Sequence, residues 1–226
     1  MRKLNFLILT LALALICFPA LADIKVLFDE NAPTEAAAGI FPDLFTGRDA
    51  GSKVEVTTKD PFKGKYCAFV TPSQSYNNQM KDWKFPIVEK PKAGEYRYII
   101  FAWKSDGGTG VMVQFPDNGA WGSVTTPCVN PPAPGTRRYI AGTNVTGWSG
   151  ICVSKDVPTK WTVVERDLFA DFGAFTITGI ALTPFSDGGA GDYYDMIIIG
   201  SDPLTISTFV SPASKLATTW GDVKNR

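Results

Sequence analysis

The side chains available for chemistry are limited, because this chain of 226 residues contains no histidine. That composition excludes catalytic arrangements in which histidine is the general base, and metal or haem sites in which it is a ligand. Carboxylate pairs remain, and Glu165 and Asp167 lie two residues apart, on one face of a strand. Glycoside hydrolysis uses two facing carboxyl groups at roughly 5–9.5 Å. A solvated strand edge produces the same spacing, and we predict a protein without enzymatic activity.

The elements that would position functional side chains are short strands. Apolar runs alternate with Gly, Pro, Asn and Asp, and no segment sustains a 3.6-residue apolar period; only Leu168–Phe172 suggests a helical turn. Many short strands without strand–helix alternation predict an all-β sandwich. We expect strands at Ile24–Phe28, Val54–Thr57, Tyr66–Val70, Tyr96–Lys104, Val111–Phe115, Arg138–Ala141, Trp161–Asp167, Thr176–Thr183 and Tyr193–Ile199.

The connections between these strands divide into one tight turn and two long stretches. The glycine-rich turn Asp106–Gly110 lies between Tyr96–Lys104 and Val111–Phe115, and the three together predict a β-hairpin. Thr71–Lys92 and Pro116–Arg137 are irregular, and the prolines of the second exclude central strand pairing. Loops of this length usually carry a function or cover a core.

The two ends of the chain differ from the part between them. Residues 1–22 carry Arg2 and Lys3, an apolar run and the small-x-small site Ala20–Ala22, a pattern typical of a secretory signal peptide. The alternative is a membrane anchor, but the apolar run is shorter than the roughly 20 residues that span a bilayer. We therefore expect a domain at residues 23–205 and a secreted, periplasmic or cell-envelope protein. Residues 206–226 form a polar tail, which is either a disordered end or a sorting or docking segment.

Charge and cysteine content narrow the partners and the compartment. Because Arg2 and Lys3 leave with residues 1–22, 20 basic and 22 acidic residues remain, a net charge of −2. A near-neutral chain without a basic cluster argues against nucleic acid or an anionic membrane surface as the partner, and no later apolar run reaches transmembrane length. In an exported protein we expect a disulfide between Cys128 and Cys152, with Cys67 as a buried thiol.

Three segments together resemble the galactose-binding-like jelly rolls, which include many carbohydrate-binding modules. They are Phe62–Ala68, Gly94–Lys104 and the strands between Trp161 and Gly200. The chain is also similar to uncharacterised sandwich domains of exported bacterial proteins. The resemblance implies an antiparallel jelly-roll topology and an exported, non-catalytic binding module. Because fold does not dictate function, the alternative is a structural or protein-interaction module of the cell envelope or an extracellular assembly.

Aromatic side chains in loops are the feature that would bind a glycan, because the apolar face of a sugar stacks on a flat ring. Trp121 and Trp148 lie in glycine-rich loops with Asn or Asp nearby. We predict a ligand site of Trp121 and Trp148, with Arg138, Tyr139 and Asn144 as hydrogen-bonding neighbours. The alternative is that both indoles cap the end of the sandwich and satisfy their N–H groups locally.

One carboxylate is a candidate metal ligand. By strict alternation Asp195 shares the strand face of Tyr193, Ile197 and Ile199, where a carboxylate needs a partner. Modules of the resembled kind often carry a structural calcium ion, and the resemblance implies Asp195 and Asp29 as two of its oxygen ligands. The alternatives are an Asp195 paired with Arg or Lys, or one exposed beside a loop.

Overall fold

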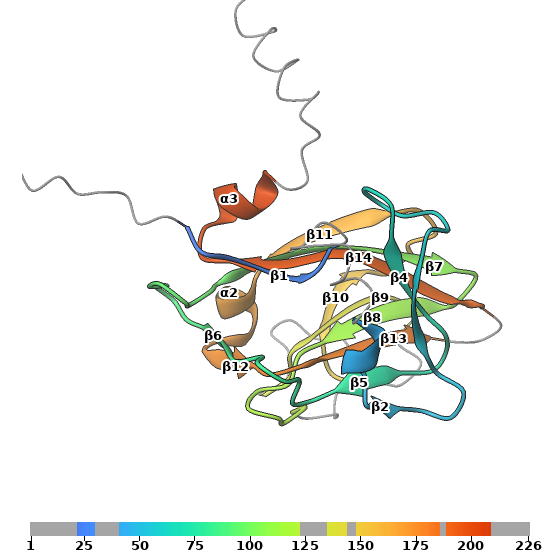
Figure 1. Cartoon of the computed structure of the whole chain (residues 1–226), viewed down its shortest axis with the longest axis horizontal. Helices are drawn as coiled ribbons and strands as arrows, with labels where there is room; N and C mark the ends of the chain where they lie inside the picture. Colours follow the sequence, from blue (N-terminus) through green and yellow to red (C-terminus); the bar gives the residue numbers. More distant parts are fainter. Residues whose placement is uncertain (1–21, 30–40, 123–134, 144–147, 186–188, 209–226) are drawn as a thin grey trace, which may run out of the picture.

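The computed structural model of the chain describes residues 22–29, 41–122, 135–143, 148–185 and 189–208. Within these ranges the chain forms two six-stranded sheets and a small two-stranded one (Figure 1). The described helical segments are short: η1 (Pro42–Leu44), α2 (Leu168–Phe172) and α3 (Pro203–Ser207). The fold is an all-β, predominantly antiparallel jelly-roll sandwich, as predicted, and α2 is the predicted helical turn.

The first sheet, which we call sheet A, is organised around its longest strand. Its strands in order are β11 (Thr162–Asp167), β7 (Tyr98–Asp106), β14 (Gly191–Gly200), β4 (Cys67–Val70) and β3 (Val54–Thr57), with β1 (Ile24–Phe28) also paired to β14. β7 pairs along both ends of β14. On the other side, β4 pairs with the first part of β14 and β1 with the last part. β14 is therefore bonded on both sides and lies at the centre of the sheet.

The second sheet, sheet B, contains one parallel pair. Its strands in order are β10 (Ile151–Ser154), β9 (Arg138–Gly142), β8 (Gly110–Gln114), β13 (Ile180–Phe185), β5 (Ser75–Asn77) and β2 (Gly47–Arg48). The β10–β9 pair is parallel and the others are antiparallel. The small sheet pairs β12 (Phe175–Ile177) with β6 (Phe85–Ile87).

Alternation along the strands assigns one face of each sheet to the shared core. In β8, Val111 and Val113 belong to the main apolar cluster between the sheets, whereas Met112 belongs to a separate cluster. Because side chains alternate across a strand, Gln114 lies on the same outer face as Met112. The same rule places Arg138 on the outer face of β9. At β8 and β9, the outer face of sheet B is thus formed by residues that lie outside the main core.

Three expectations about the strands were wrong. β7 and β8 form no hairpin with each other, because β7 already pairs with β11 and β14, so the turn Asp106–Gly110 passes the chain to sheet B. The expected single strand Thr176–Thr183 divides at Gly179 into β12 and β13, which lie in different sheets. The stretch Thr71–Lys92, expected to be irregular, contains β5 and β6.

A bulge in β14 also corrects the face assigned to Asp195. Met196 has φ 52°, and the register with β7 shifts between Asp195 and Ile198. Such an extra residue interrupts alternation. Ile197 and Ile199 consequently enter the main core, whereas Met196 and Ile198 form an outer cluster. Asp195 therefore does not share the face of Ile197 and Ile199.

Other predictions concern cysteines and chain ends. Cys67 is a free buried thiol, as predicted, and burial raises its pKa to about 12. Cys128, residues 1–21 and residues 209–226 lie outside the described residues, so the disulfide, signal peptide and tail remain predictions. Helix α3 spans the expected boundary at residue 205, and Ile206 is buried. In the ranges that the structure describes, no helix is long and apolar enough to cross a membrane.

Candidate ligand-binding pocket

A pocket of about 310 Å³ lies on the outer face of sheet B. Three of its lining residues, Trp121, Arg138 and Trp148, are among those predicted from the sequence as ligand-binding. The other lining residues, which the sequence analysis did not identify, are Asp49, Gln74, Tyr76 and Gln114. The pocket therefore combines three aromatic rings with an arginine, a carboxylate and two side-chain amides.

Two buried polar side chains form the floor of this pocket. Gln114 of β8 and Arg138 of β9 are paired in the strand register, and they are 2% and 1% exposed. Both donate to the main-chain oxygen of Trp121, from Gln114 Nε2 at 3.1 Å and from Arg138 Nη2 at 3.4 Å. The paired strands thereby hold the loop that carries one of the two predicted tryptophans.

The second tryptophan is held by the same arginine. Arg138 Nη1 donates to the Ser149 carbonyl at 3.1 Å, and its guanidinium carbon lies 5.3 Å from the ring centroid of Trp148. A guanidinium over an indole face is attracted by the ring quadrupole. Trp148 also packs against the outer cluster of Met112, Ile140 and Phe185. Arg138 is thus a positioning residue for both aromatic side chains.

The third ring comes from a strand that the sequence analysis treated as a loop. Tyr76 of β5 meets Trp121 edge to face, with ring centroids 6.1 Å apart. Gly47 of β2 is its register partner, and a Cβ at Gly47 would collide with the Tyr76 ring. The glycine therefore lets the ring lie against the neighbouring strand. Trp121, Tyr76 and Trp148 are all partly buried.

The remaining polar residues lie on the β2 and β5 side. Asp49 is exposed, and its Oδ2 accepts a hydrogen bond from Ser73 Oγ at 2.8 Å. Gln74 Nε2 donates to Thr183 Oγ1 at 2.8 Å. Gln74 and Tyr76 alternate with a buried Ser75, a period-two pattern that could have indicated the strand.

The charge of the pocket floor is positive. Burial, together with the charge of the neighbouring Arg137, lowers the pKa of Arg138 to about 10. Burial also lowers the pKa of Arg137, whose Nη2 donates to the Ala120 carbonyl at 2.9 Å. Both pKa directions reflect the cost of removing guanidinium groups from water. Arg138 remains protonated at neutral pH.

Two predicted site residues lie elsewhere. Tyr139 is fully buried on the inner face of β9, and its hydroxyl donates to Asp171 Oδ2 at 2.7 Å. It follows Arg138 directly in the strand, so alternation turns it toward the core, and we exclude it from the candidate pocket. Asn144 lies outside the described residues.

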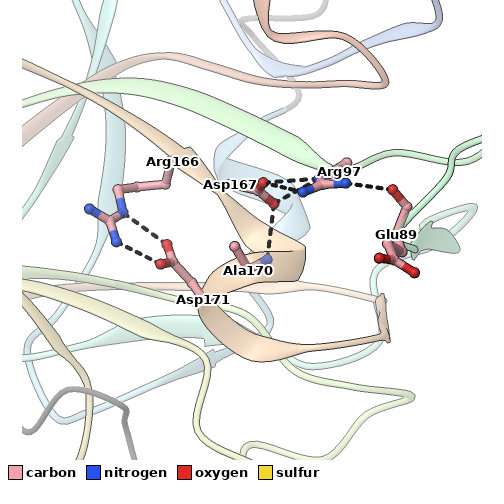
Figure 2. A network of polar contacts seen from close by, with 6 residues as sticks. All are labelled: Glu89, Arg97, Arg166, Asp167, Ala170 and Asp171. Carbon is pink, nitrogen blue, oxygen red and sulfur yellow. Dashed lines mark hydrogen bonds and ion pairs between the residues drawn. The ribbon is translucent and has the colours of Figure 1, made fainter.

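Glu165 and Asp167 have separate structural roles, and Figure 2 shows the contacts of Asp167. Asp167 binds Arg97 through both oxygens, with Nη2–Oδ2 at 2.7 Å, and caps α2 by accepting from the Ala170 N–H at 3.0 Å. Burial alone would raise the pKa of Asp167, but these hydrogen bonds outweigh it and lower the pKa. Glu165 accepts from Ser207 Oγ at 3.3 Å. A glycosidase acid needs a raised pKa, which Asp167 lacks.

The predicted calcium ligands are Asp195 and Asp29, both of which are buried. Asp195 is fully buried and accepts from the backbone N–H groups of Phe62, Lys63 and Met196 at 2.8–3.2 Å. Burial, and in smaller part the charge of Asp29, raises the pKa of Asp195 to about 7. Calcium takes six to eight oxygen ligands. The described residues contain no group of three or more His, Cys, Asp or Glu side chains that could hold a metal ion. Asp195 and Asp29 would supply only two carboxylates to such an ion, so calcium binding remains a prediction.

No protein-family model matches the chain, and no curated protein matches it in sequence. Among solved structures the chain is similar to the family 11 carbohydrate-binding module from Clostridium thermocellum, which was solved with a mixed-linked tetrasaccharide. The identity is 12% and the TM-score 0.38, with coverage of 78% of this chain and 94% of that one. It is also similar to a family 29 carbohydrate-binding module from Piromyces equi, at 8% identity and TM-score 0.35, with coverage of 81% and 93%.

A third similar structure is the glycoside hydrolase domain of Endo-D from Streptococcus pneumoniae, at 14% identity and TM-score 0.39. The alignment covers 69% of this chain but only 20% of that one. Carbohydrate-binding modules are thus among the structures to which the chain is similar, as the sequence resemblance predicted. At these values the similarity concerns the fold, and the functional argument rests on the pocket.

Proposed function

We propose that the protein is an exported, non-catalytic binding protein that takes a glycan in the pocket on the outer face of sheet B. The observation that carries the proposal is the convergence of Trp121, Trp148 and Tyr76 on one pocket with Arg138 and Gln114. Flat rings offer stacking surfaces to the apolar faces of sugar rings, and amide and guanidinium groups bind hydroxyls. A volume of about 310 Å³ lies at the lower end of small-molecule sites and suits a short stretch of glycan.

The geometry also favours binding over catalysis. The pocket contains one carboxylate, Asp49, whereas glycoside hydrolysis uses two. Asp167, the carboxylate that an enzyme hypothesis would use, lies on sheet A and is bound by Arg97. Export follows from the signal peptide expected at residues 1–22, and an N-terminus at Asp23 in protein recovered outside the cytoplasm would test it.

The test is calorimetric titration with a panel of neutral and acidic oligosaccharides. We expect Trp148→Ala to weaken binding of the best ligand about tenfold or more, because stacking contributes about 1 kcal/mol or more beyond area burial. The matched control is Trp161→Ala, which removes a partly buried indole just before β11; the ring packs against Phe62 and Tyr193. That variant should bind as the wild type does.

Thermal unfolding of both variants separates lost binding from lost structure. If no glycan binds the wild type, or if folded Trp148→Ala binds normally, glycan recognition in this pocket is refuted. The alternative of a protein-interaction module would then be the better account.

A further inference from the structure

A second pocket, of about 260 Å³, lies between the two sheets on the side where β11 and β10 are the edge strands. Sheet A contributes Trp103 of β7 and Thr162 of β11, and sheet B contributes Ala141 of β9 and Val153 of β10. Most of the remaining lining comes from residues 156–160, in the loop that joins β10 to β11. We call this the edge pocket, and it shares no lining residue with the pocket on the outer face of sheet B.

The edge pocket runs from an exposed rim to a buried indole. Trp103 and Ala141 are 0% and 1% exposed, whereas Thr159, Lys160 and Thr162 are exposed. Trp103 belongs to the main apolar cluster between the sheets, so its side chain lies on the inner face of β7. Thr162 is its register partner on β11, and directly opposed residues of an antiparallel pair project from the same face. Trp103 therefore forms the closed end of the pocket, and Thr162 part of its rim.

The indole N–H of Trp103 is a buried donor without an acceptor. Nε1 is shielded from solvent and makes no hydrogen bond within the described structure. Buried polar groups are nearly always paired, and the N–H of a buried tryptophan usually finds a partner. None of the other described residues that line the edge pocket has a buried side-chain nitrogen or oxygen left without a partner. What the closed end lacks is therefore a hydrogen-bond acceptor alone.

The loop over the edge pocket is held in place by its own hydrogen bonds. The Pro158 carbonyl accepts from the Ser105 N–H at 2.8 Å, which ties the loop to β7. The Val157 carbonyl accepts from the Thr159 N–H at 2.9 Å. The side chains of Val157 and Pro158 add apolar lining to that supplied by sheet B. A ligand would thus meet apolar walls that are already ordered, which lowers the entropic cost of binding.

We propose that the edge pocket is a second ligand site, for a small neutral molecule with an apolar body and one carbonyl oxygen. The carbonyl accepts from the Trp103 N–H at the closed end, and the apolar body contacts the walls. The charged lining residues, Asp156 and Lys160, are both exposed, so a charge carried to the closed end would be buried without a counterion. An indole N–H is a donor only, so a ligand that brings only a donor leaves it unpaired. This site is separate from the proposed glycan pocket and does not depend on it.

The experiment is an NMR titration that follows the indole N–H signals of the six tryptophans in the nitrogen-15-labelled protein. The probes are cyclohexanone and methylenecyclohexane, which have nearly the same shape but carry C=O and C=CH₂ respectively. We expect cyclohexanone to bind about tenfold more tightly, because only the ketone supplies the missing acceptor. It should also move the Trp103 signal downfield, as a newly formed hydrogen bond does, whereas methylenecyclohexane should not.

Variants locate the response. Trp103→Phe keeps a ring and removes the donor, so it should identify the Trp103 signal by its loss and abolish the preference for the ketone. If that buried variant does not fold, the signal is assigned through its contacts with Phe101, whose ring centroid lies 5.0 Å away. Thr162→Phe, at the exposed rim, should fill the entrance and remove the response to cyclohexanone. The matched control is Thr58→Phe, at an exposed position that does not line the edge pocket, and it should respond as the wild type does.

Three results would each overturn the proposal: equal affinity for the two probes, a Trp103 signal that neither probe moves, or an unchanged response in folded Thr162→Phe. If cyclohexanone moved the Trp148 or Trp121 signal instead, the ketone would bind in the pocket of sheet B, and the edge pocket would not be its site. None of these results bears on glycan binding, which the oligosaccharide titrations test separately.

Discussion

The outer face of each sheet carries a buried ionisable side chain, Asp195 on sheet A and Arg138 on sheet B, but the two differ in what surrounds them. On sheet A, Asp195 is enclosed by the chain itself, since the N–H groups of Phe62 and Lys63 bond its carboxylate. Around it lies an apolar cluster of Ile100, Met196 and Ile198, packed against Ile206 of α3. On sheet B, Arg138 lies under a pocket lined by aromatic and amide side chains. The carboxylate on sheet A is thus bonded by the chain's own backbone, whereas the guanidinium on sheet B lines a pocket.

Under the proposed function, one sandwich separates stability, on sheet A, from recognition, on sheet B. The buried apolar cluster on the outer face of sheet A includes Ile206 of the protein's own helix α3, so its contribution is to folding. The polar side chains of sheet B have hydrogen-bond partners that hold loops in place, which preorganises a surface for a ligand. Substitutions on the two faces should therefore affect different measurements.

The largest expected effect is on the stability of sheet A. Ile198→Ala should lower the free energy of unfolding by about 2–5 kcal/mol, because Ile198 is fully buried and the truncation leaves a cavity. Glycan binding by the folded fraction should be unchanged. Leu204→Ala on α3 is the control, since Leu204 is 77% exposed and should change stability by less than about 0.5 kcal/mol. A loss of affinity in folded Ile198→Ala would contradict the separation of the two faces.

The second prediction concerns the pH dependence that Asp195 contributes. Its pKa is raised from 3.8 to about 7 in the folded protein, so the folded state holds this proton more tightly than the unfolded chain does. The resulting stability is complete below about pH 4 and is lost as the pH rises toward 7. Burial also raises the pKa of Asp192, which acts in the same direction.

Asp195→Asn should flatten the fall in unfolding free energy between pH 4 and 7, by at most about 1.4 kcal/mol per pH unit. Denaturant unfolding of both proteins across this range measures the difference. If unfolding free energy varied with pH equally in both proteins, the pKa of Asp195 would not be raised in the folded state. Arg138 should contribute no comparable slope in this range, because its pKa of about 10 keeps it charged throughout.

Calcium offers a related test of the outer face of sheet A. If Asp195 and Asp29 ligate the ion, calcium should raise the melting temperature by several degrees at pH 8, about 2–4 °C for each kcal/mol of binding free energy. The rise should be smaller at pH 5, where protonated Asp195 competes with the metal. Asp195→Asn should remove the effect, and EDTA should reverse it. An unchanged melting temperature in millimolar calcium would count against the implied ion.

Local sequence rules predicted the sandwich, most strands and three of the seven pocket residues. They succeeded where one segment determines its own structure, as in β3 and the α2 turn, and where the residue type itself suggested the role, as for Trp121 and Trp148. They failed where distant contacts decide. The β7–β8 hairpin was wrong because both edges of β7 are taken by strands far along the chain.

The candidate pocket shows the same limit. Gln114 is a polar residue in an otherwise apolar strand, and only its register with Arg138 gives it a place in the pocket floor. Tyr139 has the chemistry of a sugar-binding residue, but one step along β9 turns it into the core. The side a residue faces follows from strand register, and the bulge at Met196 shows that one extra residue can reverse it.

The smallest expected effect tests whether the floor of sheet B acts on the ligand through a loop. Gln114→Ala removes the amide that donates to the Trp121 carbonyl, leaving that buried position with a weaker bond from Arg138 at 3.4 Å. We expect a loss of about 1 kcal/mol of stability, typical of one hydrogen bond, and a loss of affinity of several-fold because Trp121 is held less firmly. Ser207→Ala on α3 removes exposed hydrogen bonds to Glu165 and to the Pro203 carbonyl, far from the pocket, and should change neither quantity measurably. If Gln114→Ala lost stability but kept full affinity, Gln114 would support the fold alone. The outer face of sheet B would then resemble that of sheet A in contributing to stability through this residue.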